Sequence, residues 1–266
     1  MQDFWLIVLI YVAAGVFAGL MSGILGIGGG LVVVPALLYI FQHDALIPLK
    51  LSMHFAAGTS LAVMIFTSQA SIYSHLKLGD ILWRIYHRLW PGIFVGVLVG
   101  SVSAYFIPTR VLEIIFGLFL LVVGFKMLWG EDVTTPRQFP AGWINALVTF
   151  IIGFKSGLLG VGGGVLVIPY LTYCGIEARK IAAVSSLCTL TVAVLGTLIF
   201  MLTGRWESGL PAYATGFIYW PAVIAVAIPS VLFAPLGAKL NYILPVKQLR
   251  YGFVVILFFT AWHLLF

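Results

Sequence analysis

The chain has 266 residues, of which 62% are apolar and only 8% are charged, and its mean hydropathy is +1.14. Soluble domains carry about 25% charged residues, so this composition excludes a soluble enzyme and a soluble nucleic-acid-binding protein. The net charge of +6 comes from basic residues in short gaps between apolar runs, where the loops of membrane proteins carry them. The sequence predicts a polytopic helical membrane protein in contact with the lipid bilayer, with no nucleic acid as a partner.

Ten apolar runs follow one another along the chain. Most of them approach the roughly 20 residues that cross a bilayer as a helix. The runs at 30–42 and 164–175 are shorter, follow a glycine cluster and contain a proline near their start. Each is therefore predicted to be a tilted short helix, a half-helix or one arm of a re-entrant hairpin. The ten runs are residues 4–25, 30–42, 52–74, 90–107, 111–129, 143–159, 164–175, 181–202, 217–236 and 249–266.

The two halves of the chain repeat each other. Residues 19–37 align without gaps on residues 153–171, and eleven of the 19 positions are identical, among them six glycines. Further along, residues 56–61 align on residues 182–187. Such self-similarity indicates a duplication. We expect one integral membrane domain made of a first repeat, a connecting loop and a second repeat, at residues 1–130, 131–142 and 143–266.

The basic residues indicate how the two repeats are oriented. If each repeat crosses the membrane an odd number of times, ten Lys and Arg residues lie on the side of the basic gap 75–88, three on the other side, and one is embedded. Four crossings per repeat would place six and seven on the two sides. Because basic residues concentrate in cytoplasmic loops, the predicted fold is an all-α membrane protein of two inverted repeats. Each repeat has a glycine-broken helical hairpin plus three long transmembrane helices, and both termini lie outside.

A glycine cluster in each repeat is expected to break a helix inside the membrane. Backbone in a bilayer must be hydrogen-bonded unless it lines a cavity in the protein, and each cluster precedes a new helix, whose first N–H groups and positive dipole end point into the break. Two such ends meeting between inverted repeats would form an anion site near the midplane. The alternative is that these glycines serve close helix packing. The candidate residues are Gly26, Gly28, Gly29 and Gly30, and Gly160, Gly162, Gly163 and Gly164.

Hydroxyl side chains and one lysine are candidates for completing this site. The hydroxyls recur at equivalent positions of the two repeats, although hydroxyls in bilayer helices also bond their own backbone. Lys155 lies inside an apolar run, where an ionisable residue suggests a role; it either contacts the anion directly or snorkels to the interface. The hydroxyl candidates are Ser22, Thr59, Ser60, Ser156, Ser185 and Ser186.

Two titratable residues are candidates for proton coupling. His54 lies one turn before Thr59, and Glu113 lies in the first turn of its helix. Both have structural alternatives, since a lone histidine is often structural and a carboxylate is favoured in a first helical turn in any case. The sequence shows no nucleotide-binding motif and no paired carboxylates for a sodium site, so neither a cofactor nor a metal is expected.

The doubled glycine motif resembles that of a known family. Residues 23–30 with Pro35, and residues 157–164 with Pro169, are similar to the sulfite exporter TauE/SafE family, and the Gly58-Thr59-Ser60 element and the chain length match it too. The resemblance implies a multi-pass transporter of the bacterial cytoplasmic membrane. Its substrate would be a small sulfur-containing anion such as sulfite, sulfoacetate or another organosulfonate, and its oligomeric state is left open.

Other functional classes remain open at this point. An anion channel or a non-transporting membrane sensor has the same composition. An intramembrane serine hydrolase would use Ser22 or Ser156 with His54, but it would leave the symmetry of the glycine motifs unexplained. A secondary transporter that alternates its access between the two sides explains both the composition and the symmetry of the glycine motifs. Its transport would be coupled to an ion, most simply to protons.

Overall fold

The computed structural model describes residues 2–25, 28–43, 47–77, 82–128, 139–176, 178–207, 209–243 and 246–266. Within these ranges the chain forms ten α-helices, a short 3-10 helix, η1 (Leu49–Leu51), and a two-stranded hairpin. Seven of the described segments are long and apolar enough to cross a membrane. The helices are α1 (Gln2–Leu25), α2 (Gly30–His43), α3 (Ser52–Lys77), α4 (Trp83–Phe106), α5 (Thr109–Leu128), α6 (Gly142–Leu159), α7 (Gly164–Tyr173), α8 (Ala178–Gly204), α9 (Trp220–Ile243) and α10 (Val246–Leu265).

The order of elements is the same in the two halves of the chain. A long helix, a glycine segment and a short helix are followed by three long helices, first as α1 to α5 and then as α6 to α10. The short helices α2 and α7 have 14 and 10 residues, which at about 1.5 Å per residue is less than the roughly 30 Å of a bilayer core. Each is therefore the short arm of a helical hairpin. The predicted all-α membrane fold and its glycine-broken hairpins are confirmed, while the inversion of the second repeat stays a prediction.

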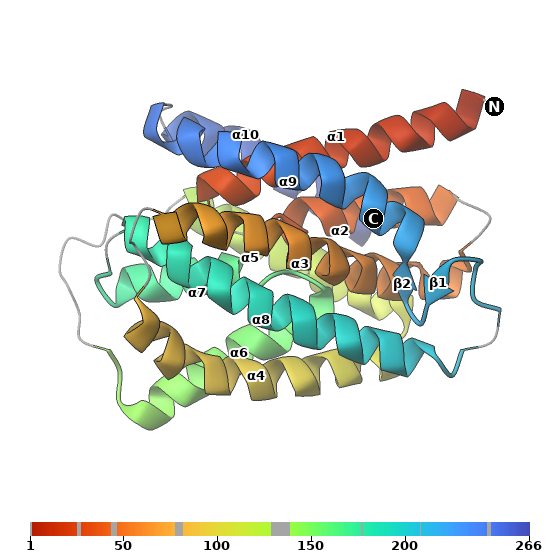
Figure 1. Cartoon of the computed structure of the whole chain (residues 1–266). Helices are drawn as coiled ribbons and strands as arrows, with labels where there is room; N and C mark the ends of the chain where they lie inside the picture. The colour runs from red at the N-terminus through yellow and green to blue at the C-terminus, as the bar shows by residue number, and fades with distance from the viewer. Residues whose placement is uncertain are drawn as a thin grey trace.

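Each half of the chain packs against the other half. Helix α4 lies along α6, α1 lies along α9, and α3 and α8 form the centre of the bundle, with α5 beside α10. Figure 1 shows α3 and α8 running through the middle of the molecule. Glycines allow the closest of these contacts, because small residues let helix backbones approach in a membrane. A Cβ atom on Gly96 would overlap the carbonyl oxygen of Phe150 on α6, and one on Gly19 would overlap that of Ser230 on α9.

The outer surface of the bundle is apolar. Large hydrophobic side chains such as Val99, Val122, Ile228 and Phe259 are exposed on α4, α5, α9 and α10. A soluble protein rarely exposes so many apolar side chains together, whereas lipid contact requires them. The protein is a multi-pass membrane protein.

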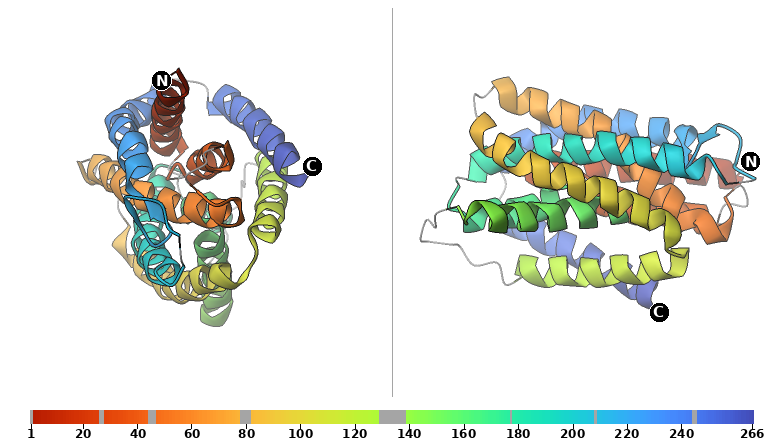
Figure 2. Two further views of the ribbon diagram at one scale, coloured as in Figure 1. Left: turned by 90° about the vertical axis from the view of Figure 1, so that its right-hand side faces the viewer. Right: turned by 90° about the horizontal axis from the view of Figure 1, so that it is seen from below.

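Both chain termini lie at one end of the bundle, which we call the terminal end, and the opposite end is the far end. Figure 2 shows the N- and C-termini facing the viewer together when the molecule is seen from the terminal end. Helix α3 runs from the terminal end to the far end, and α8 runs back alongside it (Figure 1). The placement of the terminal end outside the cytoplasm stays a prediction, and residues 131–138 of the predicted connecting loop lie outside the described residues.

A small hairpin at the terminal end departs from the all-α expectation. Strand β1 (Ala214–Thr215) pairs antiparallel with β2 (Ile218–Tyr219), and α9 begins only at Trp220. The apolar run predicted to start at residue 217 therefore begins as a strand. Gly216 has a φ of +58°, and a Cβ there would overlap the Met201 carbonyl oxygen. The turn and its close seat on α8 both require glycine at this position.

Candidate functional site

The two glycine segments interrupt the helical hairpins as the sequence predicts. Helix α1 ends at Leu25 and α2 begins at Gly30, while α6 ends at Leu159 and α7 begins at Gly164. The breaks contain left-handed backbone, with φ of +78° at Gly28 and Gly29 and +68° at Gly160, which side chains other than glycine rarely adopt. Gly26 lies outside the described residues.

The two glycine segments, 134 residues apart in the sequence, meet inside the bundle. A Cβ built on Gly30 would lie 3.0 Å from the backbone nitrogen of Gly162 and 2.9 Å from the Met64 sulfur on α3. A Cβ on Gly160 would overlap Ala57, also on α3. The start of α2 and the start of α7 therefore face one another beside α3, as a shared site between the repeats requires.

Backbone amides at the two helix starts provide hydrogen-bond donors. The carbonyl of Gly29 accepts from Val32 and Val33 at 3.0 Å each, and the carbonyl of Gly163 accepts from Leu166 at 3.2 Å and Val167 at 2.9 Å. The first amides of a helix have no acceptor within the helix. Among the described residues, the amides of Gly162 and Gly163 donate to no protein atom. Within the described part of the chain, these two buried N–H groups are therefore unpaired donors.

Thr189 on α8 links both glycine segments, and the sequence analysis missed it. Its hydroxyl accepts a hydrogen bond of 3.1 Å from the Gly164 amide. A Cβ on Gly28 would lie 2.5 Å from its methyl group. Thr189 is four residues after Ser185, so both lie on the same face of α8, and that spacing was the available signal. Thr67 on α3 was missed in the same way; its hydroxyl lies 3.4 Å from the Gly28 carbonyl oxygen.

The predicted hydroxyl residues are all buried, but their surroundings differ. Thr59 accepts a hydrogen bond of 3.1 Å from the amide of Tyr219 in the hairpin. Ser186 lies 2.8 Å from Ser71 on α3 and donates to the Ala182 carbonyl at 2.9 Å. The hydroxyls of Ser22 and Ser60 have no hydrogen-bond partner among the described residues. Ser156 and Ser185 are buried on α6 and α8.

Lys155 does not join the buried residues. Its side chain is exposed on α6, while the neighbouring Ser156 is buried. Successive residues of a helix point about 100° apart, so the ammonium group lies on the outer face and the hydroxyl on the inner face. Where the two glycine segments meet, the surrounding side chains named above are uncharged, and the electrostatic attraction for an anion comes from backbone and hydroxyl dipoles.

His54 is buried near the terminal end of α3. Its Nε2 lies 3.0 Å from the Ala104 carbonyl oxygen, which accepts only, so Nε2 carries a proton. Its Nδ1 lies 3.3 Å from the Thr109 hydroxyl, which itself donates to the Lys50 carbonyl. The ring also packs against Phe217 of the hairpin, with 5.2 Å between ring centroids. His54 thus connects α3, α4, α5 and the hairpin.

Glu113 has a structural environment. Its buried carboxylate accepts a hydrogen bond of 2.8 Å from Gln42 on α2 and pairs with Arg110 at 3.4 Å. Arg110 in turn donates to the Leu264 carbonyl at 3.1 Å. This network fastens the end of α2 to α5 and α10. Within the described residues, no group of three or more His, Cys, Asp or Glu side chains is placed to hold a metal ion.

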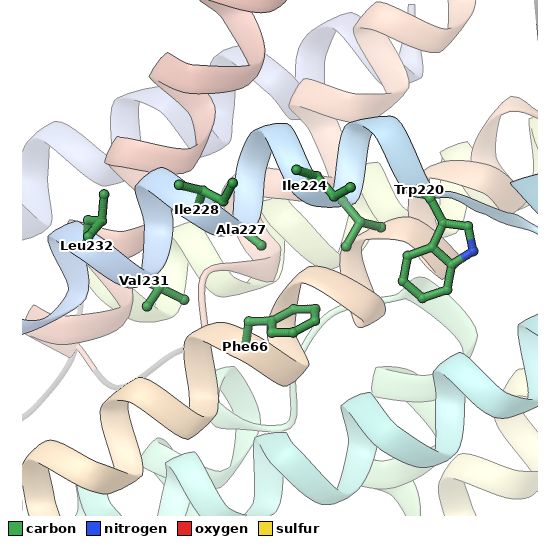
Figure 3. Close-up of a pocket in the computed structure, with 8 residues that line it drawn as sticks. Phe66, Trp220, Ile224, Ala227, Ile228, Val231 and Leu232 are labelled. Carbon is green, nitrogen blue, oxygen red and sulfur yellow. The ribbon is translucent and has the colours of Figure 1, made fainter. Parts of the chain in front are cut away.

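A groove of about 370 Å³ between α3 and α9 is separate from the glycine segments. Figure 3 shows Phe66 of α3 facing the row of α9 side chains that forms its other wall. The one polar atom among these side chains, the Trp220 indole nitrogen, already donates to Thr215 at 3.0 Å. The groove offers nothing to hold an anion. It is lined by Phe66, Trp220, Val223, Ile224, Ala227, Ile228, Val231 and Leu232.

Comparison with known proteins identifies relatives over almost the whole chain. The family model described as sulfite exporter TauE/SafE matches residues 11–264. A Haemophilus influenzae protein named "Probable membrane transporter protein" is 32% identical over 257 residues, 96% of each chain. A Methanocaldococcus jannaschii protein with the same description is 29% identical, covering 93% of this chain and 91% of its own. A Bacillus subtilis protein, also so described, is 23% identical and covers 87% and 88%. No solved structure matches the chain.

Proposed function

Because the chain belongs to the sulfite exporter TauE/SafE family and is therefore a membrane transporter rather than an enzyme, we propose that it carries a small sulfur oxyanion across the bacterial cytoplasmic membrane. Sulfite and organosulfonates such as sulfoacetate are the proposed substrates. Each presents a compact cluster of negatively charged oxygens, which suits a site built from N–H and O–H donors.

The observation that carries this proposal is the meeting of the two glycine segments. Gly30 and Gly162 pack so closely that a Cβ atom on Gly30 would lie 3.0 Å from the Gly162 nitrogen. The amides of Gly162 and Gly163 have no protein acceptor among the described residues. An anion placed there would accept hydrogen bonds from these amides and would be attracted by the positive dipole ends of α2 and α7. Hydrogen bonds to a charged group contribute about 1.5–3 kcal/mol each, net of the bonds to water that they replace, so a few of them favour the binding of a small oxyanion.

The buried hydroxyls complete the proposed site. Thr59 and Ser185 lie on α3 and α8, the two helices that flank the meeting point, and Ser22 and Ser156 lie on the long arms of the helical hairpins. Thr189 already touches both glycine segments. Lys155 takes no part in this proposal, because its side chain is exposed.

We propose protons as the coupling ion and His54 as the group that takes them up. The Thr109 hydroxyl already donates to the Lys50 carbonyl and keeps a lone pair toward Nδ1, so it can accept a hydrogen bond from a second proton on the ring. The ring packs on Phe217, and two residues further on the Tyr219 amide holds Thr59. A change of charge at His54 would therefore alter the position of the Thr59 hydroxyl in the substrate site, through the β1–β2 hairpin that contacts both residues. For Glu113 we propose a structural role.

Flux measurements on the purified protein in sealed liposomes test the proposal. A pH gradient should drive radiolabelled sulfite to an internal concentration above that outside, and unlabelled sulfoacetate should compete. Equilibration of sulfite without accumulation would contradict proton coupling and leave an anion channel or an uncoupled carrier. If sulfite and sulfoacetate neither move nor compete, the proposed substrate class is wrong.

A further inference from the structure

The repeat relates two pairs of hydroxyl residues on α3 and α8. The alignment of residues 56–61 on 182–187 is an offset of 126 residues, which places Ser60 on Ser186 and Ser71 on Thr197. Ser71 and Ser186 lie 2.8 Å apart in the half of the bundle nearer the far end. The repeat therefore predicts that Ser60 and Thr197 form the equivalent pair nearer the terminal end.

The packing of α3 on α8 supports this second pair. A Cβ on Gly196 would lie 2.7 Å from Leu61, and one on Gly58 would lie 3.2 Å from Phe200. Leu61 of α3 contacts Gly196 of α8. Because the two helices run in opposite directions, Ser60, one residue before Leu61, lies at the same level as Thr197, one residue after Gly196.

The two pairs differ in how their hydroxyl groups are satisfied. Ser186 donates to the carbonyl four residues before it and is bonded to Ser71, so the far-side pair is closed on itself. The side chains of Ser60 and Thr197 are 0% and 5% exposed, and neither hydroxyl has a hydrogen-bond partner among the described residues. Buried hydroxyl groups in native proteins are almost always paired, so these two hydroxyls lack the partner that a buried hydroxyl normally has.

We propose that Ser60 and Thr197 form a second anion-binding position, beside the glycine segments and nearer the terminal end than Ser71 and Ser186, where each hydroxyl donates to an oxygen of the substrate. This rests on the proposed function. Ser71 and Ser186 are the counterpart nearer the far end. Their hydroxyls bond each other in this conformation, and that bond breaks when access changes sides. The anion then passes from one pair of hydroxyls to the other by way of the glycine segments.

Sidedness is the readout that separates this role from a structural one. The half-saturation concentration for sulfite is measured in liposomes from each face separately, and protease access to a tag on one terminus identifies the face of the terminal end. Thr197→Val removes the hydroxyl and keeps the shape of the side chain. It should raise half-saturation from the terminal-end face about tenfold and from the other face less than about twofold, while Thr197→Ser restores it.

Two further variants complete the design. Ser186→Ala should show the reverse sidedness, weakening sulfite binding from the far-end face. Thr203→Val is the matched control on α8, because among the described residues the Thr203 hydroxyl bonds only the Ile199 carbonyl of its own helix, at 2.8 Å. This variant should match the wild-type protein from both faces.

The outcomes separate the two claims. If the wild-type protein carries sulfite and Thr197→Val is unchanged, or is impaired equally from both faces, the pair holds a water molecule or serves packing, and this inference is wrong. If the wild-type protein carries no sulfite from either face, the proposed function is wrong, and this binding position falls with it.

Discussion

The amide of Tyr219 donates a hydrogen bond of 3.1 Å to the hydroxyl of Thr59, although 160 residues separate them. The bond ties the hairpin at the terminal end to the helix that flanks the glycine segments. Phe217, two residues earlier, is 1% exposed and donates its amide to the Phe200 carbonyl at 3.1 Å. The β1–β2 hairpin therefore packs on α3 and α8 at the terminal end of the bundle, next to Thr59.

Phe217→Ala should open this end. The ring lies 5.7 Å from Phe55 and 6.3 Å from Phe200, centroid to centroid, and its loss leaves a cavity that lowers thermal stability. We expect sulfite to leak down its gradient without coupling to protons, at least about threefold faster than through the wild-type protein. Dye-reported proton flux measured alongside sulfite flux checks this. Fully coupled transport by a folded variant would show that the ring does not close the path.

Gly160→Ala and Gly163→Ala should differ sharply. A Cβ at Gly160 would overlap Ala57, and the φ there is +68°, whereas the nearest atom to a Cβ at Gly163, on Val192, is 3.2 Å away. Gly160→Ala should therefore abolish sulfite transport or prevent folding, and Gly163→Ala should keep at least about a third of the wild-type rate. Transport and size-exclusion profiles are compared for both. Equal transport by the two variants would show that the close packing of Gly160 on α3 is not needed for transport.

Lys155→Met should leave the half-saturation concentration for sulfite within about twofold of the wild-type value. The lysine side chain is exposed on α6, so a methionine at this position displaces no buried neighbour. Binding titration on purified protein is the measurement. A loss of affinity of about tenfold or more, as a direct charge-assisted contact would produce, would bring Lys155 back into the site.

His54→Gln and Glu113→Gln separate coupling from structure. Glutamine at position 54 keeps a hydrogen-bond donor but cannot take up a proton near neutral pH, so accumulation of sulfite driven by a pH gradient should be lost while sulfite exchange continues. Glu113→Gln should keep proton-driven accumulation and lower the melting temperature, because Arg110 loses its charged partner. The opposite pattern would assign coupling to Glu113.

Topology is tested by cysteine labelling in intact cells. Single cysteines in the 75–88 and 237–248 segments should be protected from an impermeant reagent, and cysteines at both termini should be labelled, because ten basic residues gather on one side and three on the other. Labelling of one terminus only, or of one of the two segments, would contradict the inverted arrangement.

The sequence allowed the helical hairpins and their glycine breaks to be predicted, because residues 19–37 and 153–171 repeat the same glycine and proline positions. It could not show that Gly30 and Gly162 touch, since that contact depends on how α2 and α7 pack across the two halves. The face of α6 that carries Lys155 is likewise set by tertiary packing. The β1–β2 hairpin was missed because a strand of two residues shows too little alternation of polar and apolar side chains to be recognised inside an apolar run.

The exchange of helix partners between the halves has a consequence for biosynthesis. Helix α1 packs on α9 and α4 packs on α6, so a ribosome that has finished only α1 to α5 leaves both without their neighbours. The glycine faces of these helices, at Gly19 and Gly96, would meet lipid until the second half is inserted. Translation of the second half is thus the assembly step, and two separately synthesised halves would meet as the subunits of a dimer do. With the second repeat inverted, as the basic residues predict, an ancestral single-repeat protein would have had to pair with a copy of itself in the opposite membrane orientation.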